Sequence, residues 1–192
     1  MRVAVWSIAA MAFASTAWTQ QDPDVIPMAY QAPKYVAPAN APSDAVIAGR
    51  NEPGDRLIVT GRALDQGMPV PDVSVYAFHA DASGLYANDG PNTDQNARLA
   101  AALRTDAEGR YRYETIRPLG SDGMAARLRH VVNAPGYKPR FCDLWLGDDP
   151  YFVKRREASL PLSDATMLFV RMPTRGADGV WQVTHDLELL RY

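Results

Sequence analysis

The chain has 192 residues, which is long enough for one domain with a substantial core and too short for two ordinary domains. Its formal net charge is −2 at pH 7 and it contains no run of Lys or Arg, so we expect no nucleic-acid partner. The single cysteine, Cys142, excludes an intrachain disulfide, and we expect it to be a buried structural thiol rather than a nucleophile.

The N-terminus has the features of a signal peptide. Met1 and Arg2 form a short basic segment, and an apolar stretch of about a dozen residues follows it. Ser15 and Ala17 then offer the small side chains of a cleavage site after residue 17. A membrane-spanning helix needs about 20 apolar residues, so an uncleaved anchor is the weaker alternative. We therefore expect an exported protein, periplasmic or secreted, without a stable membrane span.

The next segment, residues 18–53, reads as an arm or linker. It is rich in Pro, Ala, Asn and Gln and has little apolar periodicity. Its prolines remove backbone donors that a helix or strand would need. Two aromatic residues, Tyr30 and Tyr35, are available to dock it onto the domain that follows.

From residue 54 to residue 192 the sequence predicts one all-β domain. A loop rich in Asp, Asn, Gly and Pro is expected at residues 80–96, followed by a short helical stretch at 97–103. Several short strands, turn signals between them and little helix predict a β-sandwich with long loops. Short runs with two-residue alternation or β-branched residues, set between turn signals, indicate strands at 56–62, 73–78, around Tyr111 and Tyr113, and at 127–133, 140–146, 167–171 and 179–190.

Four segments, in this order, resemble the intradiol ring-cleavage dioxygenases, the protocatechuate and catechol 1,2-dioxygenase group. They are residues 54–86 (GDRLIVTGRALDQGMPVPDVSVYAFHADASGLY), 103–120 (LRTDAEGRYRYETIRPLG), 133–139 (NAPGYKP) and 147–151 (GDDPY). Single pieces such as PVPDVSV also occur in other exported β-sandwich modules, whereas the ordered set is specific. The resemblance implies a β-sandwich that holds a non-haem ferric ion through two Tyr and two His.

Most of the ligand positions that the resemblance implies have changed. The first Tyr falls on Tyr86, but residues 121–126, where the second should lie, contain no aromatic residue. Counting back from Pro135, the two His positions fall on Arg127 and Arg129. Guanidinium groups cannot deprotonate to bind a metal, and they repel cations. The resemblance therefore implies an iron site in which only Tyr86 keeps a ligand residue.

The three histidines of the sequence are weaker candidates for this site. His130 is one residue from a ligand position, and neighbouring strand residues face opposite sides, so it should face away from Tyr86 unless a β-bulge intervenes. His79 stands where the family usually has Gln; it could line the pocket, although a surface position before the loop is the favoured interpretation. We expect His185 to be a sheet residue without a catalytic partner.

The leading hypothesis is an exported binding or structural protein without a cofactor. Arg127 and Arg129 would either receive a small aromatic acid or another carboxylate, or pack against Tyr86 or acidic side chains in place of the metal. Tyr86, the two arginines, His79 and His130 form the candidate pocket.

The alternative hypothesis is an active, divergent dioxygenase with Fe(III) that cleaves a catechol-type ring. Tyr86 would then act with some of His79, His130, Tyr137 and His185 after a local change of register.

Overall fold

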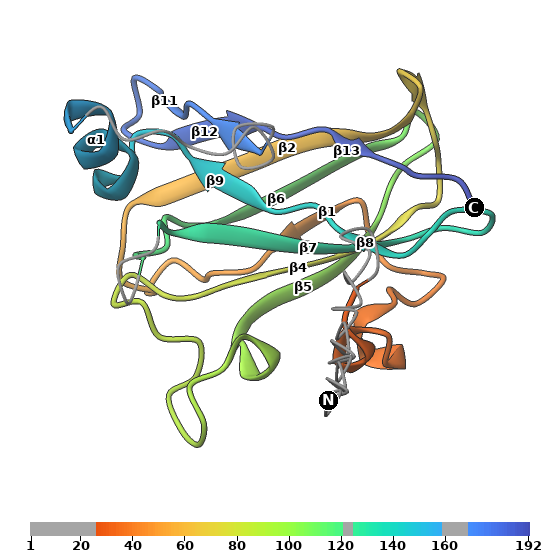
Figure 1. Ribbon diagram of the computed structural model, residues 1–192, viewed down its shortest axis with the longest axis horizontal. Helices are drawn as coiled ribbons and strands as arrows, with labels where there is room; N and C mark the ends of the chain where they lie inside the picture. The colour runs from red at the N-terminus through yellow and green to blue at the C-terminus, as the bar shows by residue number, and fades with distance from the viewer. Residues whose placement is uncertain (1–25, 121–124, 159–168) are drawn as a thin grey trace, which may run out of the picture.

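The computed structural model describes residues 26–120, 125–158 and 169–192. Two β-sheets lie face to face, with little helix around them, so the predicted all-β sandwich is confirmed (Figure 1). The predicted signal peptide, residues 1–17, lies outside the described residues, as does most of the segment where the second Tyr ligand was sought. None of the helices in the described ranges is both long and apolar enough to span a membrane.

The first sheet is built around the long strand β2 (Arg56–Asp65). Strand β2 pairs antiparallel with β6 and parallel with β12. The strand β1 lies within the segment predicted to be an arm, where the sequence indicates no strand, and it pairs with the edge of β6. In spatial order the sheet contains β1 (Asp44–Val46), β6 (Arg110–Ile116), β2, β12 (Trp181–Thr184) and β11 (Thr174–Arg175), while β3 (Met68–Pro69) and β13 (Leu187–Glu188) also pair with β2.

The second sheet has β4 (Ser74–His79) at its centre, between β5 and β7. The β4–β7 pairing runs without interruption, and places Phe78 opposite Arg129 and Ala77 opposite His130. Successive residues of each strand therefore alternate between the face that meets the first sheet and the outer face. In spatial order the sheet contains β10 (Val170–Arg171), β9 (Leu144–Leu146), β7 (Arg127–Asn133), β4 and β5 (Leu99–Arg104), while β8 (Arg140–Phe141) also pairs with β7.

The main core lies between the two sheets. Each sheet contributes every second residue of its strands, and burying large apolar side chains stabilises the fold by roughly 1.5–3 kcal/mol each. The core includes Leu57, Val59, Val75, Ala77, Leu103, Tyr113, Leu128 and Val132.

Three local predictions are corrected by the structure. The helical stretch expected at 97–103 is mostly strand β5, because Leu99 and Leu103 are buried and its backbone pairs with β4 along its whole length. The single strand expected at 140–146 is divided into β8 and β9 by residues 142–143. A helix that the sequence did not indicate, α1 (Pro150–Glu157), follows Asp149, whose carboxylate accepts the Tyr151 N–H at 2.8 Å.

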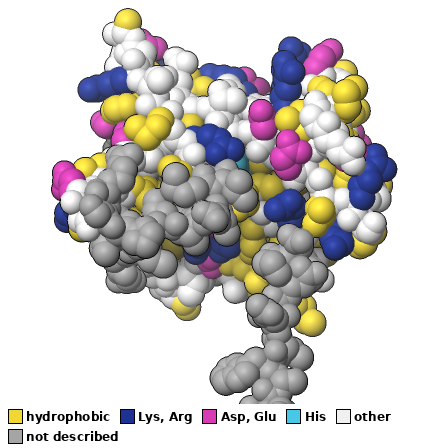
Figure 2. Space-filling view, turned by 45° about the horizontal axis from the view of Figure 1, so that its top comes forward, with side chains coloured by type: hydrophobic (Ala, Val, Ile, Leu, Met, Phe, Trp, Pro, Cys, Tyr) yellow, Lys and Arg dark blue, Asp and Glu magenta, His cyan; other side chains and the backbone are white. Residues whose placement is uncertain are grey.

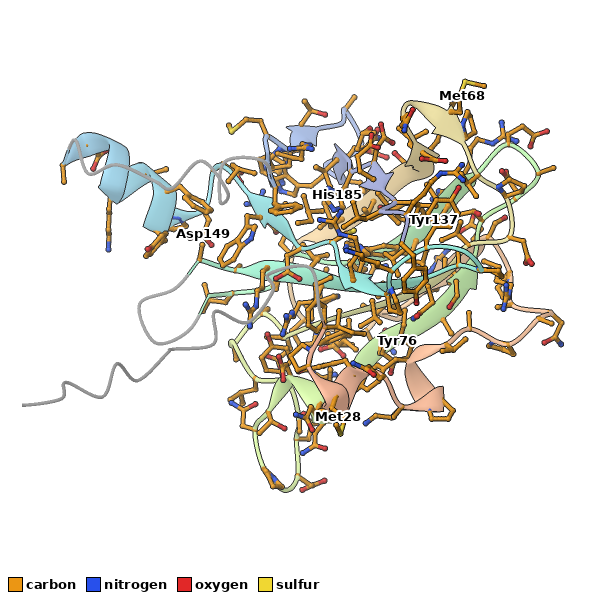
Figure 3. The ribbon with its side chains drawn as sticks, turned by 45° about the vertical axis from the view of Figure 1, so that its right-hand side comes forward. Met28, Met68, Tyr76, Tyr137, Asp149 and His185 are labelled. Carbon is orange, nitrogen blue, oxygen red and sulfur yellow. The ribbon has the colours of Figure 1, made fainter. Side chains whose placement is uncertain are left out.

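The outer face of the second sheet is covered by residues 26–38, called the arm below. Its two short 3-10 turns, η1 (Met28–Tyr30) and η2 (Pro33–Tyr35), place the buried rings of Tyr30 and Tyr35 against Phe78 and Val131. Met28 of the arm and Tyr76 of β4 lie on the same side of the molecule in Figure 3, away from His185. Charged side chains of both signs are interspersed on the face shown in Figure 2.

Candidate functional site

The two arginines of β7 point to the outer face of the second sheet. Leu128 and Val132 of the same strand belong to the main core, whereas Val131 belongs to the cluster under the arm. Because the β4–β7 pairing contains no bulge, Arg127 and Arg129 share the outer face with Val131.

Both arginines meet the same pair of carboxylates, and we call these four residues the Arg–Asp cluster. Arg129 donates to Asp94 (Nη1 to Oδ2, 2.5 Å) and to Asp143 (Nε to Oδ1, 3.2 Å). Arg127 lies 3.9 Å from Asp94 and 3.8 Å from Asp143, which are charge contacts rather than hydrogen bonds. The side chain of Arg129 is only 11% exposed and that of Asp143 16%. Two positive and two negative charges thus balance at a partly buried position.

Aromatic rings complete the surroundings of Arg129. Its guanidinium carbon lies 3.8 Å from the ring centroid of Phe141 and 5.5 Å from that of Tyr30. The Tyr30 hydroxyl donates to Asp94 Oδ1 at 2.5 Å. Burial, with the neighbouring Asp94 charge, raises the pKa of Tyr30 above its ordinary value, so the phenol stays protonated and remains a donor.

Tyr86 lies in the loop after β4 and packs, partly buried, against the cluster of apolar residues under the arm. Its backbone N–H donates to Asn92 Oδ1 at 2.7 Å, and its carbonyl accepts the N–H of Arg98 at 2.8 Å. Within the described ranges, no hydrogen bond joins its phenol to Arg127 or Arg129. The structure therefore places Tyr86 beside the same surface without binding it to the arginines.

His79 and His130 point away from this surface, into the space between the sheets. The ring of His130 contacts Tyr113 Oη (Nε2, 2.8 Å) and the Cys142 carbonyl (Nδ1, 2.7 Å). The ring of His79 contacts Thr115 Oγ1 and the Ala80 carbonyl, each at 2.6 Å. The surface position favoured for His79 is wrong, because its place in β4 faces the core and leaves it 1% exposed.

His185 and Tyr137 also contact residues other than Arg127 and Arg129. His185 is buried beside His130, with ring centroids 5.2 Å apart, and its Nε2 lies 3.3 Å from the Cys142 carbonyl. Tyr137 donates its hydroxyl to Asp65 at 3.0 Å, on the first sheet. Burial lowers the pKa of His79 and His185 to about 4 and that of His130 to about 3, so all three histidines are neutral near pH 7.

The described side chains at the arginine surface do not fit a ferric ion. No group of three or more His, Cys, Asp or Glu among the described residues has a metal-binding arrangement. The two carboxylates nearest to Arg127 and Arg129 are already paired with these guanidinium groups, which would repel the ion. Residues 121–124 lie outside the described residues.

Sequence reasoning missed the partners of the arginines, namely Asp94, Asp143 and Tyr30. Only a general signal was available, because a guanidinium that is mostly buried needs an acidic partner. The sequence offers many acidic residues, and Asp94 and Asp143 are 35 and 14 positions from Arg129.

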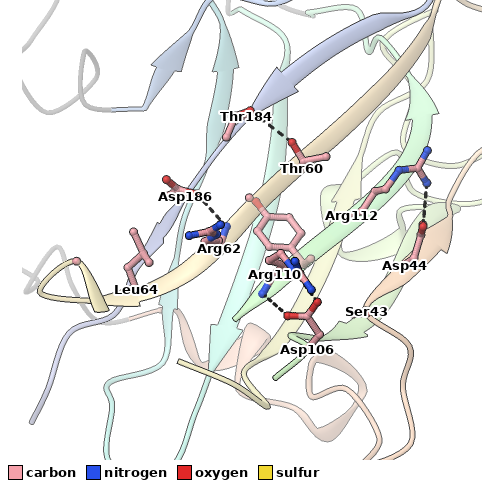
Figure 4. Close-up of a pocket in the computed structure, with 13 residues that line it drawn as sticks. Ser43, Asp44, Thr60, Arg62, Leu64, Asp106, Arg110, Arg112, Thr184 and Asp186 are labelled. Carbon is pink, nitrogen blue, oxygen red and sulfur yellow. Dashed lines mark hydrogen bonds and ion pairs between the residues drawn. The ribbon is translucent and has the colours of Figure 1, made fainter. Parts of the chain in front are cut away.

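A separate hollow of about 650 Å³ lies on the outer face of the first sheet (Figure 4). Two ion pairs line it, Arg110 with Asp106 at 2.9 Å and Arg112 with Asp44 at 2.8 Å, and the Asp186 carboxylate accepts the backbone N–H of Arg62 at 2.9 Å. Tyr111 at its floor is committed to the His185 carbonyl at 2.6 Å. The hollow is on the other sheet from the Arg–Asp cluster and is a distinct surface.

Comparison with known proteins agrees with this fold. The dioxygenase family model matches residues 30–154. The chain is 43% identical over 88 residues to the protocatechuate 3,4-dioxygenase beta chain of Burkholderia cepacia. This alignment covers 41% of this chain and 37% of that protein. It is 29% identical over 149 residues to catechol 1,2-dioxygenase of Acinetobacter baylyi, which covers 65% of this chain and 47% of that protein. The chain thus spans less than half the length of these two relatives.

Solved structures of the same kind share the architecture. Catechol 1,2-dioxygenase from Acinetobacter superposes with a TM-score of 0.62 at 23% identity, over 88% of this chain and 62% of that chain. The dioxygenase domain of a dioxygenase carbohydrate-binding protein fusion from Streptomyces sp. SirexAA-E gives a TM-score of 0.62 at 20% identity, over 88% of this chain and 98% of that chain. With the family match extending from the arm to α1, this chain belongs to the intradiol dioxygenase family.

Proposed function

We propose that this protein is an exported member of the intradiol dioxygenase family that binds no iron and acts as a binding or structural protein. One observation carries the proposal. Arg127 and Arg129 stand where the family resemblance places the two His ligands, and they are engaged with Asp94 and Asp143. We therefore propose that this chain keeps the fold of its relatives without their chemistry.

The Arg–Asp cluster opposes iron binding by charge and by geometry. A ferric ion near Tyr86 would lie beside two guanidinium groups and would have to break their pairs with the carboxylates. The cluster already balances its charge without a metal. It can hold β7, the loop before β5 and the segment between β8 and β9 together, as a bound ion would.

Arg127 is the cluster member best suited to a ligand. Its side chain is 26% exposed, and among the described residues its contacts are the two longer charge contacts and the Trp145 ring, whose centroid lies 5.9 Å from the guanidinium carbon, so the guanidinium fork keeps hydrogen-bond donors for a ligand. A carboxylate suits this fork because it can accept two parallel hydrogen bonds. Because protocatechuate, in the name of one relative, is an aromatic acid, we propose a small aromatic acid as the ligand.

Export is supported by the basic start, the apolar stretch and the small residues Ser15 and Ala17 before the predicted cleavage point. Fractionation of cells that express the full chain tests it directly. Mature protein that begins near residue 18 outside the cytoplasm is the expected result. Full-length protein confined to the cytoplasm would contradict export.

One observation supports the active-enzyme alternative, namely that Tyr86 lies on the outer face of the second sheet, as Arg127 and Arg129 do. It needs histidines at that surface as well. His79, His130 and His185 are instead committed to partners between the sheets. Bringing His79 or His130 to Tyr86 would reverse the face of a central strand residue, and moving any of the three would break these bonds.

Iron analysis is the decisive experiment. The full-length protein is incubated with ferrous iron in air, desalted, and measured for bound iron and for a visible phenolate-to-iron absorption. Oxygen consumption is then followed with catechol, protocatechuate and hydroxyquinol. We expect no stoichiometric iron, no colour and no oxygen uptake. Stoichiometric iron with a colour that Tyr86→Phe abolishes would overturn the proposal.

A further inference from the structure

Tyr30 sits on the second sheet in the way that a bound ligand would. Its ring is enclosed by three others, with centroids 5.1 Å away for Tyr35, 6.1 Å for Phe78 and 4.8 Å for Phe141. The Phe78 contact is stacked and the Phe141 contact is edge-on, which are favourable aromatic geometries. Phe78 belongs to β4, Phe141 to β8 and Tyr35 to the arm itself, and the three rings together form a cage for one aromatic ring.

The polar edge of Tyr30 is recognised separately. Its hydroxyl donates to Asp94, a charge-assisted hydrogen bond of 2.5 Å. The Arg129 guanidinium lies 5.5 Å from the ring centroid and pairs with the same carboxylate. The site therefore contacts both features of a phenol, its flat apolar ring and its single hydroxyl.

The part of the arm that carries Tyr30 has few polar contacts with the rest of the protein, and it is held mainly by the buried side chains of Ile26 and Tyr30. Within the described ranges, the backbone of residues 27–36 hydrogen-bonds only to itself. Apart from the Tyr30 hydroxyl, the polar tie of this stretch is Lys34 Nζ to the Gln95 carbonyl, at 3.1 Å on the surface. The firmer anchors come later, where Ala37 N donates to Ser74 Oγ at 2.7 Å and Arg104 donates to the Pro38 carbonyl at 2.9 Å. Residues 26–34 can leave without breaking a strand pairing.

We propose that the outer face of the second sheet is a binding site for a para-substituted phenol, that Tyr30 occupies it in cis, and that an external phenol displaces Tyr30 and releases residues 26–34. This rests on the proposed function, because the Arg–Asp cluster must be free of iron. The release would turn ligand binding into a change at the N-terminal end of the domain.

The contacts of Tyr30 predict which ligands the site binds preferentially. The Asp94 carboxylate can accept a hydrogen bond from a neutral phenol. Its negative charge repels a phenolate, and a ring without a hydroxyl offers it no hydrogen bond. A single hydroxyl is enough, since one Asp94 oxygen takes the Tyr30 hydroxyl and the other takes Arg129. The expected ligand therefore needs no pair of neighbouring hydroxyls.

The test uses full-length Tyr30→Ala with 4-methylphenol, which reproduces the side chain removed. Calorimetry should detect one site that binds 4-methylphenol roughly tenfold or more tightly than toluene, the difference expected for one charge-assisted hydrogen bond. Adding Asp94→Ala should abolish this preference. Tyr76→Ala is the matched control, because Tyr76 lies on the same face with its ring 5.1 Å from that of Tyr35 and makes no bond to Asp94.

Displacement is tested on the unaltered protein by trypsin cleavage after Lys34. Saturating 4-methylphenol should accelerate this cleavage, and toluene should not. Tyr30→Phe, which keeps the ring, should release the arm at lower 4-methylphenol concentrations and provides the test if Tyr30→Ala fails to fold. Equal binding of toluene and 4-methylphenol, or cleavage unaffected by 4-methylphenol in both proteins, would overturn the inference. Neither result depends on the iron measurement, so the two proposals can fail separately.

Discussion

The guanidinium of Arg129 lies 2.5 Å from a carboxylate oxygen of Asp94, and this ion pair joins β7 to the long loop between β4 and β5. Arg129→Leu would leave Asp143 with only the longer contact to Arg127, and Asp94 with that kind of contact and the neutral Tyr30 hydroxyl. Because both carboxylates are mostly buried, we expect the free energy of unfolding in urea to fall by about 3 kcal/mol.

The control for this substitution is Arg110→Leu, which removes exposed ion pairs on the other sheet and should cost much less. The double variant Asp94→Leu with Arg129→Leu should be less destabilised than the sum of the two single variants, because it leaves no unpaired partner in this pair. Additive losses would show that the pair does not couple.

The fold could be predicted because its strands carry their pattern locally. Leu57 and Val59 are buried and alternate with the partly exposed Arg56, Ile58 and Thr60 in β2, and Arg127, Arg129 and His130 sit on the faces that a regular strand gives them. Residues 97–103 were predicted wrongly because their Ala and Leu content favours helix locally, whereas the pairing with β4 is decided by distant residues.

Only part of the candidate site could be predicted from the sequence. The sequence resemblance predicts arginines at the two positions expected for His ligands, but the acids that pair with these arginines lie in a long loop and in a break between strands, where no periodicity fixes a side chain. Tyr30 was noted as an aromatic residue that could dock the arm, but nothing in the sequence assigned it to Asp94. Contacts of this kind depend on the tertiary arrangement.

Acid should destabilise the protein before its paired carboxylates titrate. The folded-state pKa of His79 and His185 is about 4 and that of His130 about 3, below the ordinary 6.5, because burial opposes the charged ring. The unfolded chain therefore binds more protons below pH 6.5, and stability falls as pH drops from about 6.5 towards 4. Urea midpoints measured between pH 7.5 and 4.5 check this.

Two features separate this effect from carboxylate protonation. The hydrogen bond from Arg98 lowers the pKa of Glu52, so its contribution is lost only as pH falls below the ordinary value of 4.5. His130→Gln removes one titrating ring and should flatten the pH dependence above 4.5, although it lowers stability overall. Urea midpoints that stay constant from pH 7.5 to 4.5 would contradict the buried neutral histidines.

Gly61 is required by the close approach of the backbone between β12 and β13. A Cβ at this position would lie 2.0 Å from the His185 carbonyl oxygen and 2.9 Å from the Tyr111 ring. Gly61→Ala must therefore push the backbone near His185 away from β2, and we expect a loss of about 3 kcal/mol in unfolding free energy. Gly49→Ala is the control, since nothing lies within 4 Å of its added Cβ. Equal stability of the two variants would contradict this packing.

Cys142 should report on global unfolding. It follows β8 in the chain and its side chain is buried in the main core, where burial raises the pKa of the thiol to about 12, so the folded protein holds almost no reactive thiolate. A disulfide reagent should therefore label Cys142 only through opening of the fold, at a rate that rises with urea in step with the unfolding equilibrium. Arg129→Leu should then accelerate labelling in buffer by on the order of a hundredfold, which is its expected stability loss expressed as an equilibrium constant. Rapid stoichiometric labelling of the native protein, or identical rates for the two proteins, would mean that the region around Cys142 opens without unfolding, and that the Arg–Asp cluster does not hold the second sheet closed over it.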